Sequence, residues 1–153
     1  MFHPIGLILA TNKPVIIADP YTCTVQRDEL VDIKEQILKR RYTAIGLAKN
    51  CSTFGILLST KPGQQQKIKA IECKDFLRQH KKQVYSIIIN HITPSALENF
   101  PQIDCFISTA CPRIVIDDAP NYNTLMITPV ELKIAFGVLP LKTYQFDEIT
   151  NYK

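Results

Sequence analysis

The chain has 153 residues, of which 46% are apolar and 21% are charged, so it is long enough to bury a core and its composition excludes a disordered protein. The formal net charge of +4 is modest, and its basic clusters at residues 39–41 and 81–82 each lie near the end of a predicted helix, where they complement the helix dipole. Such a charge gives no reason to expect direct binding of nucleic acid.

Neither a membrane span nor a disulfide framework is expected. No apolar run reaches the roughly 18 residues that a span requires, and no basic segment precedes the short apolar stretch at the N-terminus. The five cysteines are scattered instead of clustered in a small loop-rich scaffold, so reduced thiols are the default. We therefore expect a cytoplasmic protein without a membrane partner.

The first 50 residues predict the end of an α/β unit that begins elsewhere. Residues 14–18 are expected to form a buried strand and residues 27–49 a long helix, with an apolar face made of Leu30, Ile33, Ile37, Ala44, Ile45 and Ala48. The helix-like stretch at residues 3–11 has no strand before it, and one strand cannot form a sheet by itself. A missing neighbour would complete this unit.

Strands and helices alternate from residue 54 onwards, which predicts a parallel sheet covered by helices. Strands are expected at residues 54–60, 84–90, 103–109 and 124–127. A helix is expected at residues 65–81, with an apolar side formed by Ala70, Ile71, Cys73 and Leu77. Thr93 followed by Pro94, and a capping box from Thr128 to Glu131, predict the starts of two more helices.

The predicted fold class is α/β, with small parallel sheets flanked by helices. Residues 53–153 are expected to form one complete domain. Residues 1–52 are expected to form the C-terminal part of a preceding α/β domain, which needs a partner.

Two cysteines lie six residues apart in the stretch IDCFISTACPRIVIDD. Strand alternation sends Ile103, Cys105 and Ile107 to one face, so Cys105 is expected to pack in the core as a small apolar residue. Cys111 falls just past the end of this strand, where ligands bind in open α/β sheets. Pro112 disfavours a helical conformation at Cys111 and holds it extended.

Arg113 places a permanent positive charge close to Cys111, which would favour the thiolate or bind an anionic group of a ligand. The alternative is that Cys111 fills a turn and Arg113 forms a salt bridge, and the residues alone do not decide between the two. No second cysteine stands at metal-ligand spacing from Cys111. Any metal at Cys111 would therefore need ligands from elsewhere.

Several separated segments resemble the diphthamide-synthesis family, the 2-(3-amino-3-carboxypropyl)histidine synthases (Dph1/Dph2 family). They occur in the family's order and cover nearly the whole chain: FHPIGLILATNKPVIIADP (2–20), KRRYTAIGLAKN (39–50), GILLSTKPGQ (55–64), IDCFISTACPRIVIDD (103–118) and ITPVEL (127–132).

The resemblance implies an iron–sulfur enzyme. In that family three related α/β domains each contribute one cysteine to a 4Fe-4S cluster that binds S-adenosylmethionine, and radical cleavage transfers a 3-amino-3-carboxypropyl group to a histidine of elongation factor 2. The third-domain cysteine of the family corresponds to Cys111. The other four cysteines match no ligand motif: Cys23, Cys51, Cys73 and Cys105.

The family's first two cluster cysteines have no counterpart in this sequence, which opens downstream of both. The resemblance therefore implies a C-terminal half, encoded separately or expressed as a fragment, that is inactive and without cluster when alone. Its expected partners are an N-terminal half or paralogous subunit with the other two cysteines, and elongation factor 2 as protein substrate. The assembled enzyme is expected to be a dimer.

The resemblance also suggests residues that bind S-adenosylmethionine. Gly63 and Gln64 follow a strand end on the same edge as Cys111, where glycine allows close approach of the backbone and Gln64 could bond polar groups of the cofactor. The alternative is a loop that caps the next helix. His3 would face the cofactor or be structural, and Arg113 is the fourth candidate.

Two other functions stay open. The chain could be a non-catalytic scaffold or a subunit that supports the cluster of its paralogue. It could also be an unrelated α/β module for a nucleotide or small molecule, although it has neither a Gly-x-Gly-x-x-Gly pattern nor a Walker loop.

Overall fold

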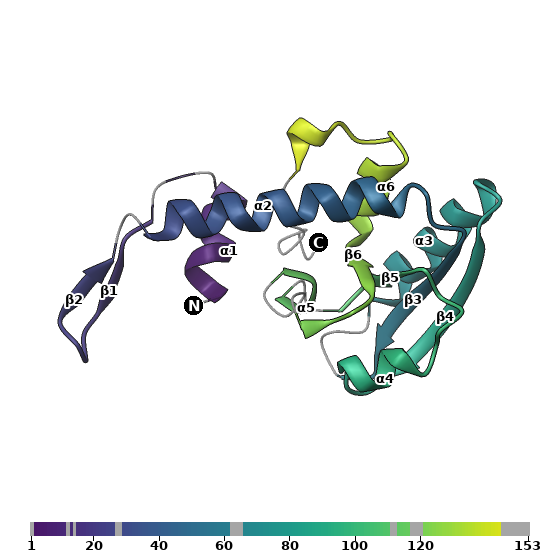
Figure 1. Ribbon diagram of the computed structural model, residues 1–153, viewed down its shortest axis with the longest axis horizontal. Coiled ribbons are helices and arrows are strands. Elements are labelled where there is room, and N and C mark those ends of the chain that lie inside the picture. Colours follow the sequence, from purple (N-terminus) through teal and green to yellow (C-terminus); the bar gives the residue numbers. More distant parts are fainter. Residues whose placement is uncertain are drawn as a thin grey trace.

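A four-stranded parallel sheet forms the centre of the computed structural model, which describes residues 2–11, 13, 15–26, 29–61, 66–110, 113–116 and 121–144 (Figure 1). The strands lie in the order β4-β3-β5-β6, and every pairing is parallel. Their bounds are Thr53–Ser59 for β3, Gln83–Ile89 for β4, Cys105–Ser108 for β5 and Leu125–Ile127 for β6. The α/β fold class and all four predicted strands are confirmed, with β5 shorter than expected.

Helices cover both faces of this sheet. Their bounds are Phe2–Thr11 for α1, Glu29–Ala48 for α2, Lys67–Gln79 for α3, Pro94–Glu98 for α4, Arg113–Ile116 for α5 and Pro129–Ala135 for α6, with a 3-10 turn η2 at Leu141–Thr143. Within the described ranges, none of these helices is long and apolar enough to cross a membrane.

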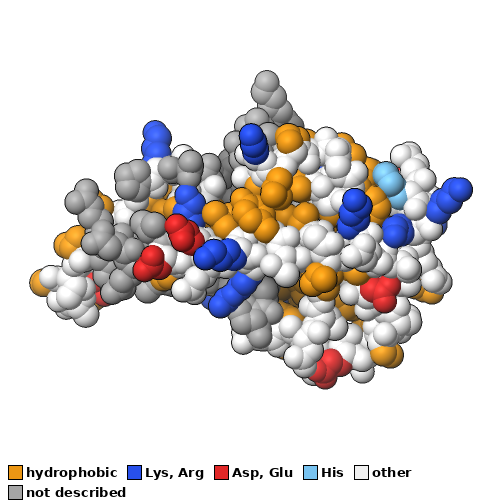
Figure 2. Space-filling model, turned by 45° about the horizontal axis from the view of Figure 1, so that its top comes forward, with side chains coloured by type: hydrophobic (Ala, Val, Ile, Leu, Met, Phe, Trp, Pro, Cys, Tyr) orange, Lys and Arg blue, Asp and Glu red, His pale blue; other side chains and the backbone are white. Residues whose placement is uncertain are grey.

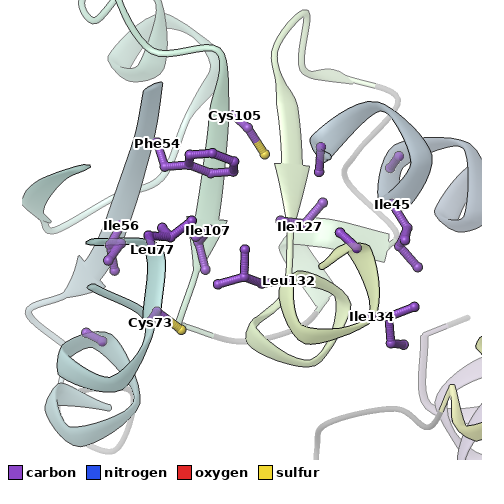
Figure 3. Close-up of a cluster of buried hydrophobic side chains, with 14 residues drawn as sticks. Ile45, Phe54, Ile56, Cys73, Leu77, Cys105, Ile107, Ile127, Leu132 and Ile134 are labelled. Carbon is purple, nitrogen blue, oxygen red and sulfur yellow. The ribbon is translucent and has the colours of Figure 1, made fainter. Parts of the chain in front are cut away.

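The larger core lies between the sheet and the helices α2, α3 and α6 (Figure 3). Phe54 and Ile56 of β3 point into it, as do Cys105 and Ile107 of β5, because alternate residues of a strand share a face. Complete burial of an Ile, Leu or Phe side chain contributes about 1.5–3 kcal/mol each. The helices supply Ala44, Ile45, Ala48, Ala70, Cys73, Leu77, Leu132, Ile134 and Ala135.

A second core lies on the other face of the sheet, under α4 and α5. It consists of Leu57, Ile87, Leu97, Ile103, Phe106, Val115 and Met126. The prediction that Ile103 shares a face with Cys105 is wrong. Ile103 precedes the strand, and a Cβ atom added at Gly55 would lie 2.7 Å from Ile103 Cδ1 and 3.0 Å from Phe106 Cδ1, so Ile103 and Phe106 fill the space that Gly55 leaves.

The N-terminal segment differs from its prediction. The expected buried strand at residues 14–18 is instead β1 at Ile17–Asp19, which is only partly buried. It pairs with an unpredicted strand, β2 at Thr24–Gln26, in an antiparallel hairpin that projects from one end of the molecule (Figure 1). Asp19 accepts a hydrogen bond from the Tyr21 amide at 2.8 Å in the turn, and Cys23 has a positive φ of 52°. These turn residues close the hairpin.

Helix ends and faces follow the sequence with two exceptions. Thr93 accepts from the Ala96 amide at the start of α4, and the capping box of Thr128 and Glu131 starts α6, both as predicted. Ile71 was expected on the apolar side of α3, but it is 59% exposed. Residues 39–41 were expected near the end of their helix, but α2 continues to Ala48.

The predicted domain boundary between residues 52 and 53 stays a prediction. Helix α2 ends at Ala48, before this boundary, but its C-terminal end packs in the core of the four-stranded sheet. The other end of α2 packs with α1 and α5 in a separate cluster of Ile5, Ile8, Leu9, Ile37 and Ile116.

Low pH should destabilise the hydrogen bonds at the start of β3. Both the Ser52 and Thr53 amides donate to Asp104 Oδ2 at 2.9 Å, and these bonds lower the pKa of Asp104. A lowered folded-state pKa stabilises the fold above the unfolded value of about 4, and this stabilisation is lost as the pH falls through the lower folded value. We expect the urea midpoint of Asp104→Asn to fall less between pH 7 and pH 3 than that of the wild type. Asp75→Asn, which changes an exposed carboxylate of α3, is the charge control, and an equal fall in all three would contradict the prediction.

Candidate functional site

Buried polar side chains gather where the parallel strands end. Ser59 is the last residue of β3 and is 5% exposed. Ser108 ends β5 at 2% exposure and Thr109 follows it at 1%, while Thr128 follows β6 at 6%. The carboxyl ends of neighbouring parallel strands share one edge of the sheet, which is where open α/β folds bind ligands. We call this set of residues the carboxyl edge.

Hydrogen bonds tie the ends of β3, β4 and β5 together. The Thr60 amide donates to the Ile89 carbonyl at 3.2 Å, and its hydroxyl to Asn90 Oδ1 at 3.0 Å. Thr109 donates to the Leu57 carbonyl from its hydroxyl at 2.8 Å. The carboxyl edge is therefore a rigid base for the loops that leave it.

Ser108 differs from its neighbours at this edge. Its hydroxyl is buried without a hydrogen-bond partner, alone in this respect among the side chains that the structure describes. An unsatisfied buried hydroxyl costs about 1–3 kcal/mol. Such a group, three residues before Cys111, is suited to bond a ligand at the carboxyl edge.

The cost of this orphan hydroxyl can be measured. We expect Ser108→Ala to raise the free energy of unfolding of the chain by about 1 kcal/mol, because it removes an unpaired buried group. Thr109→Val is the matched comparison, and it should lower the free energy of unfolding by about 1 kcal/mol because it removes a hydrogen bond. Urea denaturation checks both values, and a Ser108→Ala variant that loses stability as Thr109→Val does would show that the hydroxyl is already paired.

Most residues that the sequence suggested for the site cannot be placed. Cys111, Gly63 and Gln64 lie outside the described residues, as does the side chain of His3. Arg113 is exposed at the start of α5. The structure describes the chain on either side of these segments.

The described residues that precede two of these segments follow neighbouring strands of the sheet. Lys61 follows β3 and precedes the segment of Gly63 and Gln64. Ala110 follows β5 and precedes Cys111. Strands β3 and β5 are paired in parallel, with Leu57 opposite Ser108. Helix α1, which includes the backbone of His3, packs through Ile5, Ile8 and Leu9 near Ile116 of α5. All four candidate segments therefore connect to one region, at the carboxyl edge and α5.

A buried ion pair beside this region was not predicted from the sequence. Arg41 of α2 donates from Nε to Glu131 Oε1 at 2.8 Å and from Nη2 to Oε2 at 2.6 Å, and the two side chains are 5% and 0% exposed. The same guanidinium donates to the carbonyls of Met126 at 2.8 Å and of Val115 at 3.0 Å. Burial lowers the pKa of Arg41, but its hydrogen bonds and charge interaction with Glu131 outweigh this and raise the pKa above its usual value.

Glu131 also accepts hydrogen bonds from two residues in the C-terminal part of the chain. The Thr128 amide donates to its Oε2 at 2.8 Å, and the Tyr144 hydroxyl to its Oε1 at 2.9 Å. Burial and the charge of Glu131 raise the pKa of Tyr144, which stays a neutral donor. One sequence signal could have revealed the pair: Arg41 lies four residues from both Ile37 and Ile45, on the apolar face of α2.

Cys105 is a core residue, as predicted. It is fully buried and points between β5 and β6 into the larger core (Figure 3). Its hydrogen bond with Cys51 and its burial raise the pKa of the Cys105 thiol well above the usual value. It therefore remains protonated, which is unfavourable for a metal ligand.

The described residues contain no group of three or more His, Cys, Asp or Glu side chains that could hold a metal ion.

Comparisons with known proteins agree along nearly the whole chain. A family model described as "Putative diphthamide synthesis protein" matches residues 1–147. The 2-(3-amino-3-carboxypropyl)histidine synthase of Pyrococcus horikoshii is 33% identical over 97% of this chain and 42% of its own length. The synthase of Methanocaldococcus jannaschii is 34% identical over 97% of this chain and 43% of its own length.

A eukaryotic relative and a solved structure also match this chain. The 2-(3-amino-3-carboxypropyl)histidine synthase subunit 1 of Schizosaccharomyces pombe is 32% identical over 92% of this chain and 32% of its own length. A crystal structure of Dph2 from Pyrococcus horikoshii with a 4Fe-4S cluster superposes with a TM-score of 0.83 at 32% identity, covering 97% of this chain and 41% of that chain. The chain thus spans less than half the length of these relatives.

Proposed function

We propose a function from one premise: the chain belongs to the diphthamide-synthesis family. It acts as the C-terminal part of a 2-(3-amino-3-carboxypropyl)histidine synthase, which transfers the aminocarboxypropyl group of S-adenosylmethionine to a histidine of elongation factor 2, in the cytoplasm. The observation that carries the proposal is the position of Cys111 in the chain. In the sequence it follows Ser108, the last residue of β5, by three residues, and the fold superposes on a protein with a 4Fe-4S cluster.

The residues at the carboxyl edge fit a shared cluster. Cys111 would supply one thiolate, and the unpartnered Ser108 hydroxyl would offer a hydrogen bond to a cluster sulfur or a cofactor oxygen. When bound, a 4Fe-4S cluster supplies an electron and an open iron site for cleavage of S-adenosylmethionine. The remaining thiolates would come from the rest of the protein or from a partner subunit.

Four residues would hold S-adenosylmethionine. Arg113 would pair its guanidinium with the carboxylate of the cofactor, and Gly63 would let the backbone approach it closely. Gln64 would bond its polar groups, and His3 would face it from α1. These proposed roles are supported by the described residues next to the four segments, which lie near the carboxyl edge and α5.

The hairpin end of the molecule is the proposed contact with the rest of the enzyme. Its exposed apolar side chains are Ile16 at 55%, Tyr21 at 97% and Val25 at 68%, and apolar side chains are visible at this end in Figure 2. Exposed apolar side chains that are grouped on one short hairpin favour a protein interface. Such an interface would bring the missing cluster ligands to this chain in a dimeric assembly.

A second candidate is a non-catalytic subunit that supports the cluster of a paralogue. It is favoured by the match to proteins named subunit 1 and subunit 2, the latter from Cryptococcus neoformans at 27% identity over 81% of this chain. Cleavage of S-adenosylmethionine that depends on this chain would separate the two candidates.

The test is anaerobic assembly. The chain is mixed with the polypeptide that carries the other cluster cysteines, iron and sulfide, and bound iron and aminocarboxypropyl transfer to elongation factor 2 are measured. The proposal expects both to need the two polypeptides together. A mixture that stays colourless and inactive would contradict it.

A further inference from the structure

Arg41 joins four parts of the chain through one side chain. Its guanidinium bonds the carboxylate of Glu131 on α6, the Met126 carbonyl on β6 and the Val115 carbonyl on α5. The planar guanidinium donates in these fixed directions at once, which an ammonium group cannot do. Arg41 therefore fixes α5 against α2 and the end of β6.

Helix α5 depends on such external contacts. It has only four residues, and a single turn is not stable by itself. Val115 packs in the second core, Ile116 packs with α1 and α2, and the bond from Arg41 Nη1 to the Val115 carbonyl holds its backbone at 3.0 Å. This bond satisfies one of the carbonyl groups that a short helix leaves open.

The chain between β5 and α5 is short. Only Cys111 and Pro112 separate Ala110, which is 6% exposed, from Arg113 at the start of α5. The three Cα–Cα steps from Ala110 to Arg113 span about 11 Å at most, so the placement of these two residues limits the reach of the segment between them. One end is fixed by β5, and the other by α5.

We propose that Arg41 is a positioning residue for Cys111, because it fixes the helix that anchors the C-terminal side of this ligand. The inference rests on the proposed function, in which Cys111 binds iron. Arg41 touches neither cluster nor cofactor. It acts by keeping the thiolate where the shared site needs it.

The test compares Arg41→Lys with two matched variants in the assembled enzyme. Lysine keeps the positive charge opposite Glu131 but cannot also hold the two carbonyls. Arg40→Lys makes the same change at the neighbouring exposed position. Tyr144→Phe removes the hydrogen bond to Glu131 and leaves the bonds that Arg41 donates to Glu131, Met126 and Val115 in place.

We expect Arg41→Lys to weaken iron binding about 10-fold or more, the usual effect of changing a partner that orients a metal ligand. Its electron paramagnetic resonance signal should also differ from that of the wild type, while both control variants keep the wild-type values. Wild-type iron binding and an unchanged signal in Arg41→Lys would overturn the proposal. A Tyr144→Phe variant that loses iron equally would do so as well, because the effect would then follow from general destabilisation.

A second measurement works without iron. Iodoacetamide labelling of the iron-free chain, read by peptide mass, is expected to be several-fold faster at Cys111 in Arg41→Lys, while buried Cys73 and Cys105 stay unlabelled. Equal rates at Cys111, or faster labelling of all three cysteines, would overturn the positioning role. If wild-type assemblies bind no iron, the proposed function fails, and the labelling still decides whether Arg41 fixes this segment.

Discussion

Cys111→Ala is expected to remove the iron and the aminocarboxypropyl transfer of the assembled enzyme, and Cys105→Ala to leave both in place. The two thiols are six residues apart, but only one follows the strand end. Cys105 is fully buried with a raised pKa, so it stays a neutral thiol in the core. In the proposed cluster, loss of one thiolate of three would leave a second iron without a protein ligand. Bound iron, absorbance of the cluster and product formation are the measurements.

The control needs attention to stability. Cys105→Ala leaves a small cavity between β5 and β6, which should cost about 1 kcal/mol of unfolding free energy. Assembly at a temperature well below the melting transition of this variant keeps it folded. A Cys111→Ala assembly with full iron content would show that Cys111 is not a ligand of the cluster.

The elements of the four-stranded sheet were predictable because local signals agree with the fold. Strand β3 is a nearly continuous apolar run, as expected for a strand covered on both faces. The caps at Thr93 and Thr128 depend on residues three positions apart, which any reader of the sequence can see. Such signals need no knowledge of distant contacts.

The predictions that were wrong concern positions whose structure depends on contacts with residues distant in the sequence. Ile103 was placed by alternation, but β5 begins only at Cys105, so the alternation does not extend to it. It turns to the other face because Gly55, on the neighbouring strand, leaves room there. The second strand of the hairpin was not predicted because its three residues, Thr-Val-Gln, carry no apolar pattern.

The ion pair shows the same limit for the site. Arg41 and Glu131 are 90 residues apart, and each has a sufficient local explanation, as part of a basic cluster and as part of a capping box. Only the fold brings them together. The sequence could indicate the cysteine at the carboxyl edge, but not the side chains that fix the helix after it.

Glu131→Gln is expected to lower the free energy of unfolding by about 3–5 kcal/mol, because it leaves the buried charge of Arg41 without its partner. The carboxylate accepts hydrogen bonds from Arg41, Thr128 and Tyr144, and an amide replaces one accepting oxygen with a donor. Urea denaturation at neutral pH gives the value. Glu98→Gln, at an exposed position of α4, should change it by less than about 0.5 kcal/mol. A loss in Glu131→Gln as small as in this control would mean that the pair is solvated.

The double variant Arg41→Met with Glu131→Leu separates stability from positioning. Replacing a buried pair by apolar side chains often restores stability, since no charge is left buried. Here the recovery should be partial, because the carbonyls of Val115 and Met126 and the Thr128 amide lose their partners. If the ion pair served stability alone, iron binding would recover together with the free energy of unfolding. A double variant that regains stability but still binds iron poorly would show that the pair also positions α5.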